Sequence, residues 1–223
     1  MHTVIVLALA AAVALASTNS SANEITITQI GDNLLMDIEQ DGEDHVIKKK
    51  TTTSKIDGDG VLFVVYQTKN DNILEYDQIT GDDNAIGIFQ GENIYGWEAS
   101  GSHGNNNYVG INVEGSDNIV RHQQLHNYHD VNTDIQGNNN TVWSNQQNYG
   151  AKSINLTINN DDNTVDIDQR NGNTSTSHTA TITLDGTYGT TLDLNQSGWA
   201  PNSYTLNQYC TNAAGCSLTV TQQ

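Results

Sequence analysis

The stretch Asn72-Ile73-Leu74-Glu75-Tyr76-Asp77-Gln78 decides the fold of this chain. Side chains of an extended strand alternate between its two faces, so Asn72, Leu74, Tyr76 and Gln78 point to the same side. Gly and Asp cluster at residues 81–83, which predicts a tight turn. The same spacing begins again at Asn84, so the stretch defines a template, Asn-x-φ-x-φ-x-Gln, in which φ is an apolar residue.

This template recurs along most of the chain. Complete copies begin at Asn23, Asn72, Asn84, Asn163 and Asn202, and copies altered at one position begin at Asn93, Asn107, Asn118, Asn140 and Thr190. Asn118, Asn140 and Asn163 follow one another at steps of 22 and 23 residues, with a weaker strand in each gap. The repeat is therefore a strand and turn of about 11 residues, and two of them form a coil of about 22.

A single pair of such strands cannot bury its apolar face, but stacked coils can. They would form two sheets about 10 Å apart, with successive coils about 4.8 Å apart. The pattern therefore predicts an all-β protein, a two-sheet β-solenoid of roughly nine coils. Amides at fixed inner positions would lie above one another and hydrogen-bond along the stack, as in cross-β assemblies. This predicted self-assembly ladder consists of Asn23, Gln29, Asn72, Gln78, Asn84, Gln90, Asn118, Gln124, Asn140, Gln146, Asn163, Gln169, Gln196, Asn202 and Gln208.

Composition narrows the range of functions. The chain has 223 residues, and its net charge of −18 excludes nucleic acid as an expected partner, because phosphate binding needs clustered Lys and Arg. No paired carboxylates and no Ser/His/Asp grouping stand apart from the repeats. We therefore expect no enzymatic activity, no cofactor and no metal.

The ends of the chain differ from its repeats. An apolar run at residues 4–16, followed by small residues, predicts a signal peptide over residues 1–22. The rest of the sequence contains no second apolar run, so we expect no membrane-spanning segment. Residues 23–71 are expected to form irregular N-terminal coils, and residues 72–209 the regular repeats. Residues 210–223 are expected to form a last strand closed by a disulfide between Cys210 and Cys216, since a secreted chain meets oxidising conditions.

Several groups of residues suggest binding functions instead. The Asx-rich segments 57–60 and 160–163 could hold calcium, but their spacing matches no known calcium loop, so plain turns are the simpler interpretation. Thr179, Thr181 and Thr183 have the spacing of ice-binding surfaces but do not repeat along one face. Trp97, Trp143 and Trp199 are candidates for a surface on which sugar rings stack. His122, His126 and His129 form a possible metal-binding cluster, but His122 and His129 should face different ways on the predicted strand-turn-strand.

The repeats also carry a resemblance to a known family. Residues 23–33, Asn-Glu-Ile-Thr-Ile-Thr-Gln-Ile-Gly-Asp-Asn, and residues 163–169, Asn-Thr-Val-Asp-Ile-Asp-Gln, resemble the repeats of curlins, the secreted bacterial subunits of curli amyloid fibres. The resemblance extends from about residue 23 to residue 223. It implies a β-solenoid that is exported unfolded through an outer-membrane secretion channel and polymerises at the cell surface, with roles in biofilm matrix and adhesion.

The partners implied by the resemblance are other copies of the same chain and a nucleator subunit. A capped, monomeric β-solenoid is the alternative, acting as an adhesin module that binds ice, calcium or surface carbohydrate.

Overall fold

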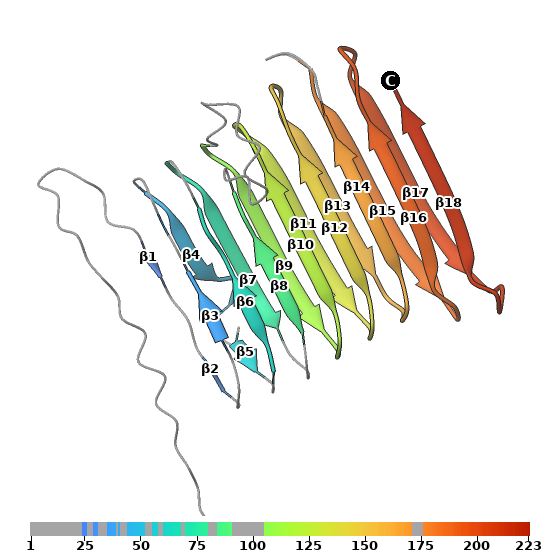
Figure 1. Ribbon diagram of the computed structural model, residues 1–223, viewed down its shortest axis with the longest axis horizontal. Helices are drawn as coiled ribbons and strands as arrows, with labels where there is room; N and C mark the ends of the chain where they lie inside the picture. The colour runs from blue at the N-terminus through green and yellow to red at the C-terminus, as the bar shows by residue number, and fades with distance from the viewer. Residues whose placement is uncertain are drawn as a thin grey trace, which may run out of the picture.

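The structure is a computed structural model, and it describes residues 24–25, 29–30, 35–38, 40, 44–51, 55–57, 60–67, 70–79, 84–90, 105–170 and 176–223. Two parallel sheets lie face to face, and the chain crosses from one to the other in every coil (Figure 1). Coils follow one another at a spacing of about 24 residues. The expected all-β, two-sheet β-solenoid is confirmed, with coils slightly longer than the 22 residues expected from the sequence.

The ten-stranded sheet contains every second strand of the regular region. Its strands, in spatial order, are β1 (Glu24–Ile25), β4 (Val46–Lys49), β7 (Ile73–Ile79), β9 (Tyr108–Glu114), β11 (His129–Gln136), β13 (Lys152–Ile158), β15 (His178–Gly186) and β17 (Asn202–Cys210). The short strands β2 (Gln29–Ile30) and β5 (Lys55–Asp57) pair with each other, and β5 also pairs with β7.

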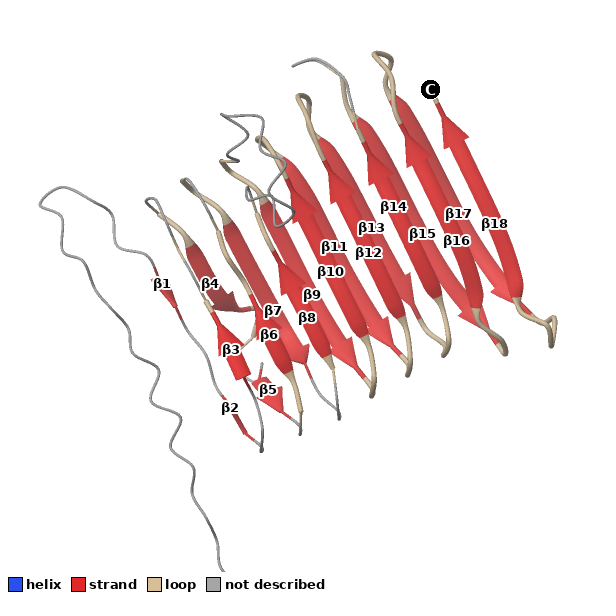
Figure 2. Cartoon of the chain, viewed as in Figure 1, coloured by secondary structure: helices blue, strands red, loops and turns tan. Residues whose placement is uncertain are grey.

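The eight-stranded sheet contains the alternate strands. They are β3 (Leu35–Asp37), β6 (Leu62–Val64), β8 (Ala85–Ile88), β10 (Ile119–Gln124), β12 (Thr141–Gln146), β14 (Thr164–Gln169), β16 (Thr190–Gln196) and β18 (Cys216–Gln222). In Figure 2 the described elements are strands joined by loops. No helix that could cross a membrane occurs among the described residues.

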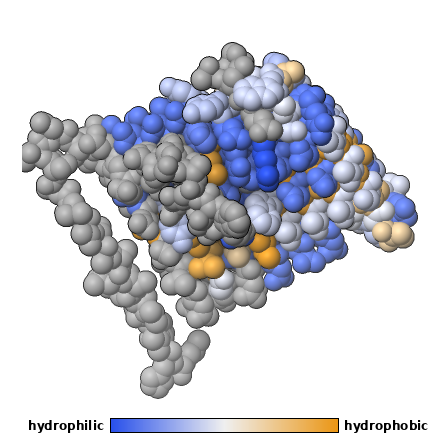
Figure 3. Space-filling view, turned by 45° about the horizontal axis from the view of Figure 1, so that its top comes forward, coloured by the Kyte–Doolittle hydropathy of each residue, from blue (hydrophilic) through white to orange (hydrophobic). Residues whose placement is uncertain are grey.

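The core lies between the two sheets and consists of aliphatic columns. Adjacent coils are in register, so that Val120, Val142, Val165 and Leu192 lie one above another, each at most 1% exposed. The outward positions carry mainly Thr, Asn, Asp and Ser. The face shown in Figure 3 is accordingly mostly hydrophilic, with only small groups of hydrophobic side chains.

Two corners connect the sheets. Corner I comprises the loops that lead from the eight-stranded to the ten-stranded sheet, along the upper edge of Figure 1. Its described residues are 125–128, 147–151, 170, 176–177 and 197–201. Corner II comprises the opposite loops, at residues 115–118, 137–140, 159–163 and 187–189. At corner II a Cβ on Gly137 would lie 2.3 Å from Asn160 O in the next coil, so this close approach of two backbones needs a glycine.

Candidate site: the stacked amide columns

The asparagine column runs along corner II. Asn84, Asn118, Asn140 and Asn163 are each at most 1% exposed. The Oδ1 atom of each accepts the backbone N–H of its counterpart in the next coil, at 2.9 Å for Asn118, 3.0 Å for Asn140 and 2.9 Å for Asn163. Asn163 Oδ1 continues the column by accepting from the backbone of Thr190 at 2.8 Å. Each side chain therefore joins two coils as well as capping a turn.

The glutamine column runs along the other end of the same strands. Its side chains donate from Nε2 to the Oε1 of the next coil, from Gln124 to Gln146, Gln169, Gln196 and Gln222 in turn, at 3.0, 3.0, 2.7 and 2.8 Å. The second N–H of each amide reaches across to the ten-stranded sheet, where the acceptors are the carbonyls of Tyr108, Asp130, Ser153, Thr179 and Ser203. Because a carbonyl can only accept, these cross-links fix the orientation of the amides.

The glutamine column changes direction once. Toward the N-terminus, Gln90 Nε2 donates to Gln67 Oε1 at 2.7 Å, and Gln67 Nε2 donates to Gln40 Oε1 at 2.8 Å. Gln90 lies just after β8 and Gln124 ends the paired strand β10, and both are fully buried. No donor among the described residues reaches Oε1 of either Gln90 or Gln124. The glutamine column is therefore interrupted between these two coils.

The corresponding first position of the ten-stranded sheet is more varied. It holds, in successive coils, Asn72, Asn107, His129, Lys152, His178 and Asn202. All six place a side-chain nitrogen 2.6–3.4 Å from a backbone carbonyl at corner I, those of Gln90, His126, Leu125, Tyr149, Arg170 and Ser197. The requirement at this position is thus a side-chain N–H donor, which Asn, His and Lys all supply.

Burial shifts the ionisation of these donors. Burial is the main cause that lowers the pKa of His129 to about 3, and the nearby Lys152 lowers it further. Burial alone lowers the pKa of Lys152 to about 8, and its Nζ donates to Tyr149 O and Gly150 O at 2.7 and 3.1 Å. Burial also lowers the pKa of His178. The histidines are therefore neutral at pH 7, which leaves Lys152 as the cation of this column.

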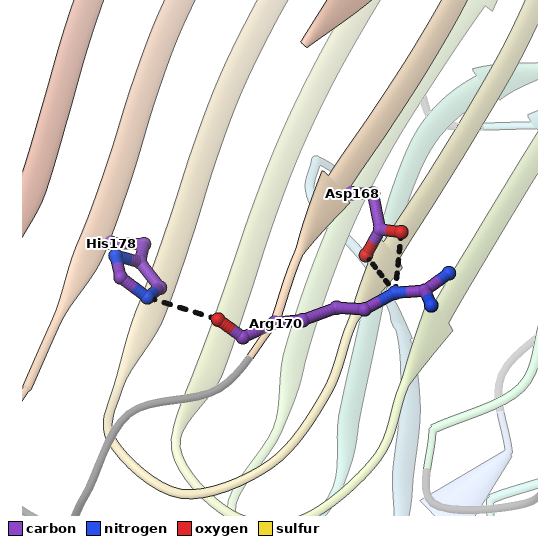
Figure 4. A network of polar contacts seen from close by, with 3 residues as sticks. All are labelled: Asp168, Arg170 and His178. Atoms are coloured by element: carbon purple, nitrogen blue, oxygen red, sulfur yellow. Dashed lines mark hydrogen bonds and ion pairs between the residues drawn. The ribbon is translucent and has the colours of Figure 1, made fainter. Parts of the chain in front are cut away.

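Figure 4 shows how one of these donors is anchored. His178 Nε2 lies 3.1 Å from the backbone oxygen of Arg170, at the start of the corner I loop. The guanidinium of Arg170 turns the other way and donates from Nε to Asp168 Oδ1 at 2.6 Å, forming an ion pair on the outer face. This ion pair is half-exposed, so it contributes at most about 1 kcal/mol.

Two of the predicted ladder residues, Gln78 and Gln208, lie outside the glutamine column. Gln78 is not an inner residue, because a register irregularity between Tyr76 and Ile79 turns it outward, where Nε2 donates to Glu114 Oε1 at 3.2 Å. Ile79 takes the inner position. Gln208 faces inward in β17 but pairs with Leu184, at the end of an aliphatic column.

In the ten-stranded sheet, aliphatic residues therefore occupy the column where glutamines were expected. Gln29 pairs with Ile56 of this same aliphatic column, although its side chain lies outside the described residues, as does Asn23. Asn202 is half-buried in β17. The remaining predicted residues of the ladder, Asn72, Asn84, Gln90, Asn118, Gln124, Asn140, Gln146, Asn163, Gln169 and Gln196, are fully buried.

The other candidates from the sequence do not form a site. His122 is buried in the core, with Nδ1 2.6 Å from Ser144 Oγ and Nε2 2.7 Å from Thr133 Oγ1, whereas His126 lies in corner I. Within the described ranges, no group of three or more His, Cys, Asp or Glu could hold a metal ion. Cys210 and Cys216 form a disulfide in the turn between β17 and β18.

The structure likewise does not bring the tryptophan candidates or the calcium candidates together into a site. Trp143 lies on the outer face, with the guanidinium of Arg121 5.3 Å from its ring centre, and Trp199 is 73% exposed at corner I. Trp97 and residues 58–59 lie outside the described residues. Of the segment 160–163, Asp161 accepts from the backbone N–H of Asn138, so this segment forms stacked turns.

Comparison with known proteins identifies no relative. No family model matches the chain, and no curated protein and no solved structure matches it. The assignment of a function therefore depends on the geometry of the columns and of the solenoid ends.

Proposed function

We propose that this chain is a secreted structural protein that assembles end to end into extracellular, curli-like fibres at a bacterial cell surface, for biofilm matrix and adhesion. The observation that carries the proposal is the edge formed by β17 and β18. Each of these strands pairs on one side only in the described part of the chain. They are nine and seven residues long, and neither contains a charged residue or a proline.

This edge lacks the features that prevent strand addition. Soluble β-proteins protect their edge strands with Lys, Pro, bulges or short length, because unpaired backbone groups recruit further strands. The whole chain has a net charge of −18, yet its edge strands β17 and β18 contain no charged residue. A heterologous contact between unlike ends does not close on itself, so addition at this edge would continue into a filament.

The inner face of the last coil provides a driving force for addition. Tyr204, Leu206, Leu218 and Val220 pack against the core but are only partly buried, whereas their counterparts in the preceding coil, such as Ile182 and Leu194, are fully buried. A further coil stacked on this end would cover them. Burying one such side chain completely contributes about 1.5–3 kcal/mol.

Seeded assembly of the mature chain from residue 23 tests the proposal. We expect fibres after removal of denaturant, a lag in thioflavin-T fluorescence, and loss of the lag when preformed seeds are added. A nucleator subunit and a secretion channel would be needed only in the cell. A stable, β-rich monomer that never elongates on seeds would contradict the proposal and favour a capped monomeric solenoid.

Variants at the edge make the test specific. Cys216 N and Gln222 O bond toward β16 and its flanking loops, and residues of a parallel strand bond alternately to the two neighbouring strands. Thr219 therefore directs its backbone groups to the free edge. We expect Thr219→Pro to stop elongation without unfolding the solenoid, since proline is tolerated on edges. Thr219→Val, which keeps the N–H, is the matched control and should elongate normally.

A further inference from the structure

Corner I carries a line of exposed aromatic side chains. Tyr128, Tyr149 and Trp199 are 65%, 60% and 73% exposed. Tyr128 directly precedes β11, and Tyr149 lies in the loop that leads to β13 in the next coil. Trp199 lies in the loop that leads to β17, two coils further along. We call these three residues the aromatic ridge. The corner I loops that carry these residues follow one another along the upper edge of Figure 1.

The ridge is presented at a conformational cost. Tyr128 has a φ of 64° and its neighbour His126 a φ of 77°, both in the left-handed region that bulky residues avoid. Such strain costs on the order of 1–3 kcal/mol per residue and persists at positions that serve a function. A glycine or asparagine would relieve it, so an exposed tyrosine here indicates a surface role for the ring.

The loops that bear the ridge are held in place. Tyr149 O accepts from Lys152 Nζ at 2.7 Å, and the Tyr149 ring lies against the His126 ring with their centroids 5.1 Å apart. Trp199 O accepts from Thr176 Oγ1 at 3.0 Å. These bonds hold the backbone of the loops that carry Tyr149 and Trp199, which lowers the entropic cost of binding there.

The chemistry of the ridge selects one class of ligand. Tyr and Trp combine an apolar ring with a polar group, and their exposed rings can stack on the apolar faces of sugars while the polar groups hydrogen-bond to hydroxyls. A polyanion is disfavoured by the net charge of −18, and Lys152 is buried rather than presented at the surface. The charged side chain at corner I, Arg170, pairs with Asp168.

From this geometry we infer that the aromatic ridge binds an extended, uncharged polysaccharide that runs along the solenoid axis. Successive sugar rings pack on Tyr128 and Tyr149, and the chain continues to Trp199. This inference is independent of end-to-end assembly, because the ridge lies along the side of the solenoid and the assembly edge lies at its end. A single molecule presents the whole ridge, and an assembled fibre would repeat it.

Affinity electrophoresis of the folded full-length chain tests the inference. The probes are xyloglucan, hydroxyethyl cellulose and a soluble β-1,3-glucan as neutral polymers, with alginate as the acidic comparison. We expect retardation by at least one neutral polymer. The triple variant Tyr128→Asn, Tyr149→Ser and Trp199→Ser should weaken that binding at least tenfold, since Asn tolerates the positive φ at position 128.

A matched control removes aromatic rings from the opposite side of the solenoid. Tyr188 and Tyr209, 39% and 63% exposed near corner II, are replaced by serine. This control should bind like the wild type. Circular dichroism should show the same β-signal for all three proteins.

Each outcome of the electrophoresis experiment either supports or overturns polysaccharide binding by the aromatic ridge. Absence of retardation by every neutral polymer, retardation by alginate alone, or equal loss in the control would overturn the inference. A change in sedimentation of the triple variant without polysaccharide, with no change in polysaccharide binding, would assign the ridge to contacts between copies instead. The triple variant should still elongate on seeds, so failure of glycan binding and failure of fibre assembly remain distinguishable.

Discussion

Gln146 offers the sharpest test of the amide column. Its Nε2 donates to Gln169 Oε1 and to Asp130 O, and its Oε1 accepts from Gln124, all inside a fully buried site. Gln146→Leu keeps the size of the side chain but leaves two acceptors without their donor. Each unsatisfied buried group costs about 1–3 kcal/mol, and Gln124 keeps its bond to Tyr108 O. We expect a loss of about 3–4 kcal/mol in the free energy of unfolding.

Urea unfolding followed by circular dichroism measures this loss by linear extrapolation. Gln136→Leu is the matched control, because Gln136 ends the adjacent strand of the opposite sheet and is exposed. The same chemical change there should shift stability by no more than about 0.5 kcal/mol. If Gln146→Leu were as mild as the control, the reasoning that the column stabilises the core would be refuted.

Three further predictions concern single features of the fold. Burial lowers the pKa of His122 from 6.5 to about 3, so the unfolded chain binds more protons and stability should fall as pH drops from about 6.5 toward 3. Wild type should lose more stability over this range than His122→Ile, as measured by urea unfolding at each pH. Gly137→Ala should destabilise by about 1–3 kcal/mol, measured by urea unfolding, because the new Cβ meets the Asn160 carbonyl. Reduction of the Cys210–Cys216 disulfide should lower stability by about 2 kcal/mol, measured as the shift in urea midpoint with a reductant.

Each of these predictions has a contrary result. Equal pH slopes for wild type and His122→Ile would show that this imidazole is not held neutral in the core. An unchanged midpoint for Gly137→Ala would mean that corner II can open without cost. A midpoint insensitive to reductant would mean that the last turn is ordered without its covalent link.

The sequence was sufficient for the eight-stranded sheet. Asn118, Asn140 and Asn163 recur at coil spacing, and the strand period of two then places the glutamine six residues later on the same face. Both amide positions recur in the coils of β10, β12 and β14, and there the two columns were predictable residue by residue. In β16 and β18 the asparagine position is held by Thr190 and Cys216 instead.

The ten-stranded sheet was not predictable in the same way. Parity alone cannot reveal the register irregularity that turns Gln78 outward and Ile79 inward. His129 and Lys152 were missed because they do not look like asparagine, although each stands one coil beyond a donor at the same position. Their shared role is to donate to corner I carbonyls, and it becomes visible only when the loops are placed in space.

X-ray diffraction from aligned fibres of residues 23–223 tests the central claim most directly. If coils of successive molecules continue one amide-laddered stack, a reflection near 4.8 Å must lie along the fibre axis and one near 10 Å across it. Fibres in which the spacing of about 4.8 Å lies perpendicular to the axis would contradict the account, because the strands would then run along the fibre.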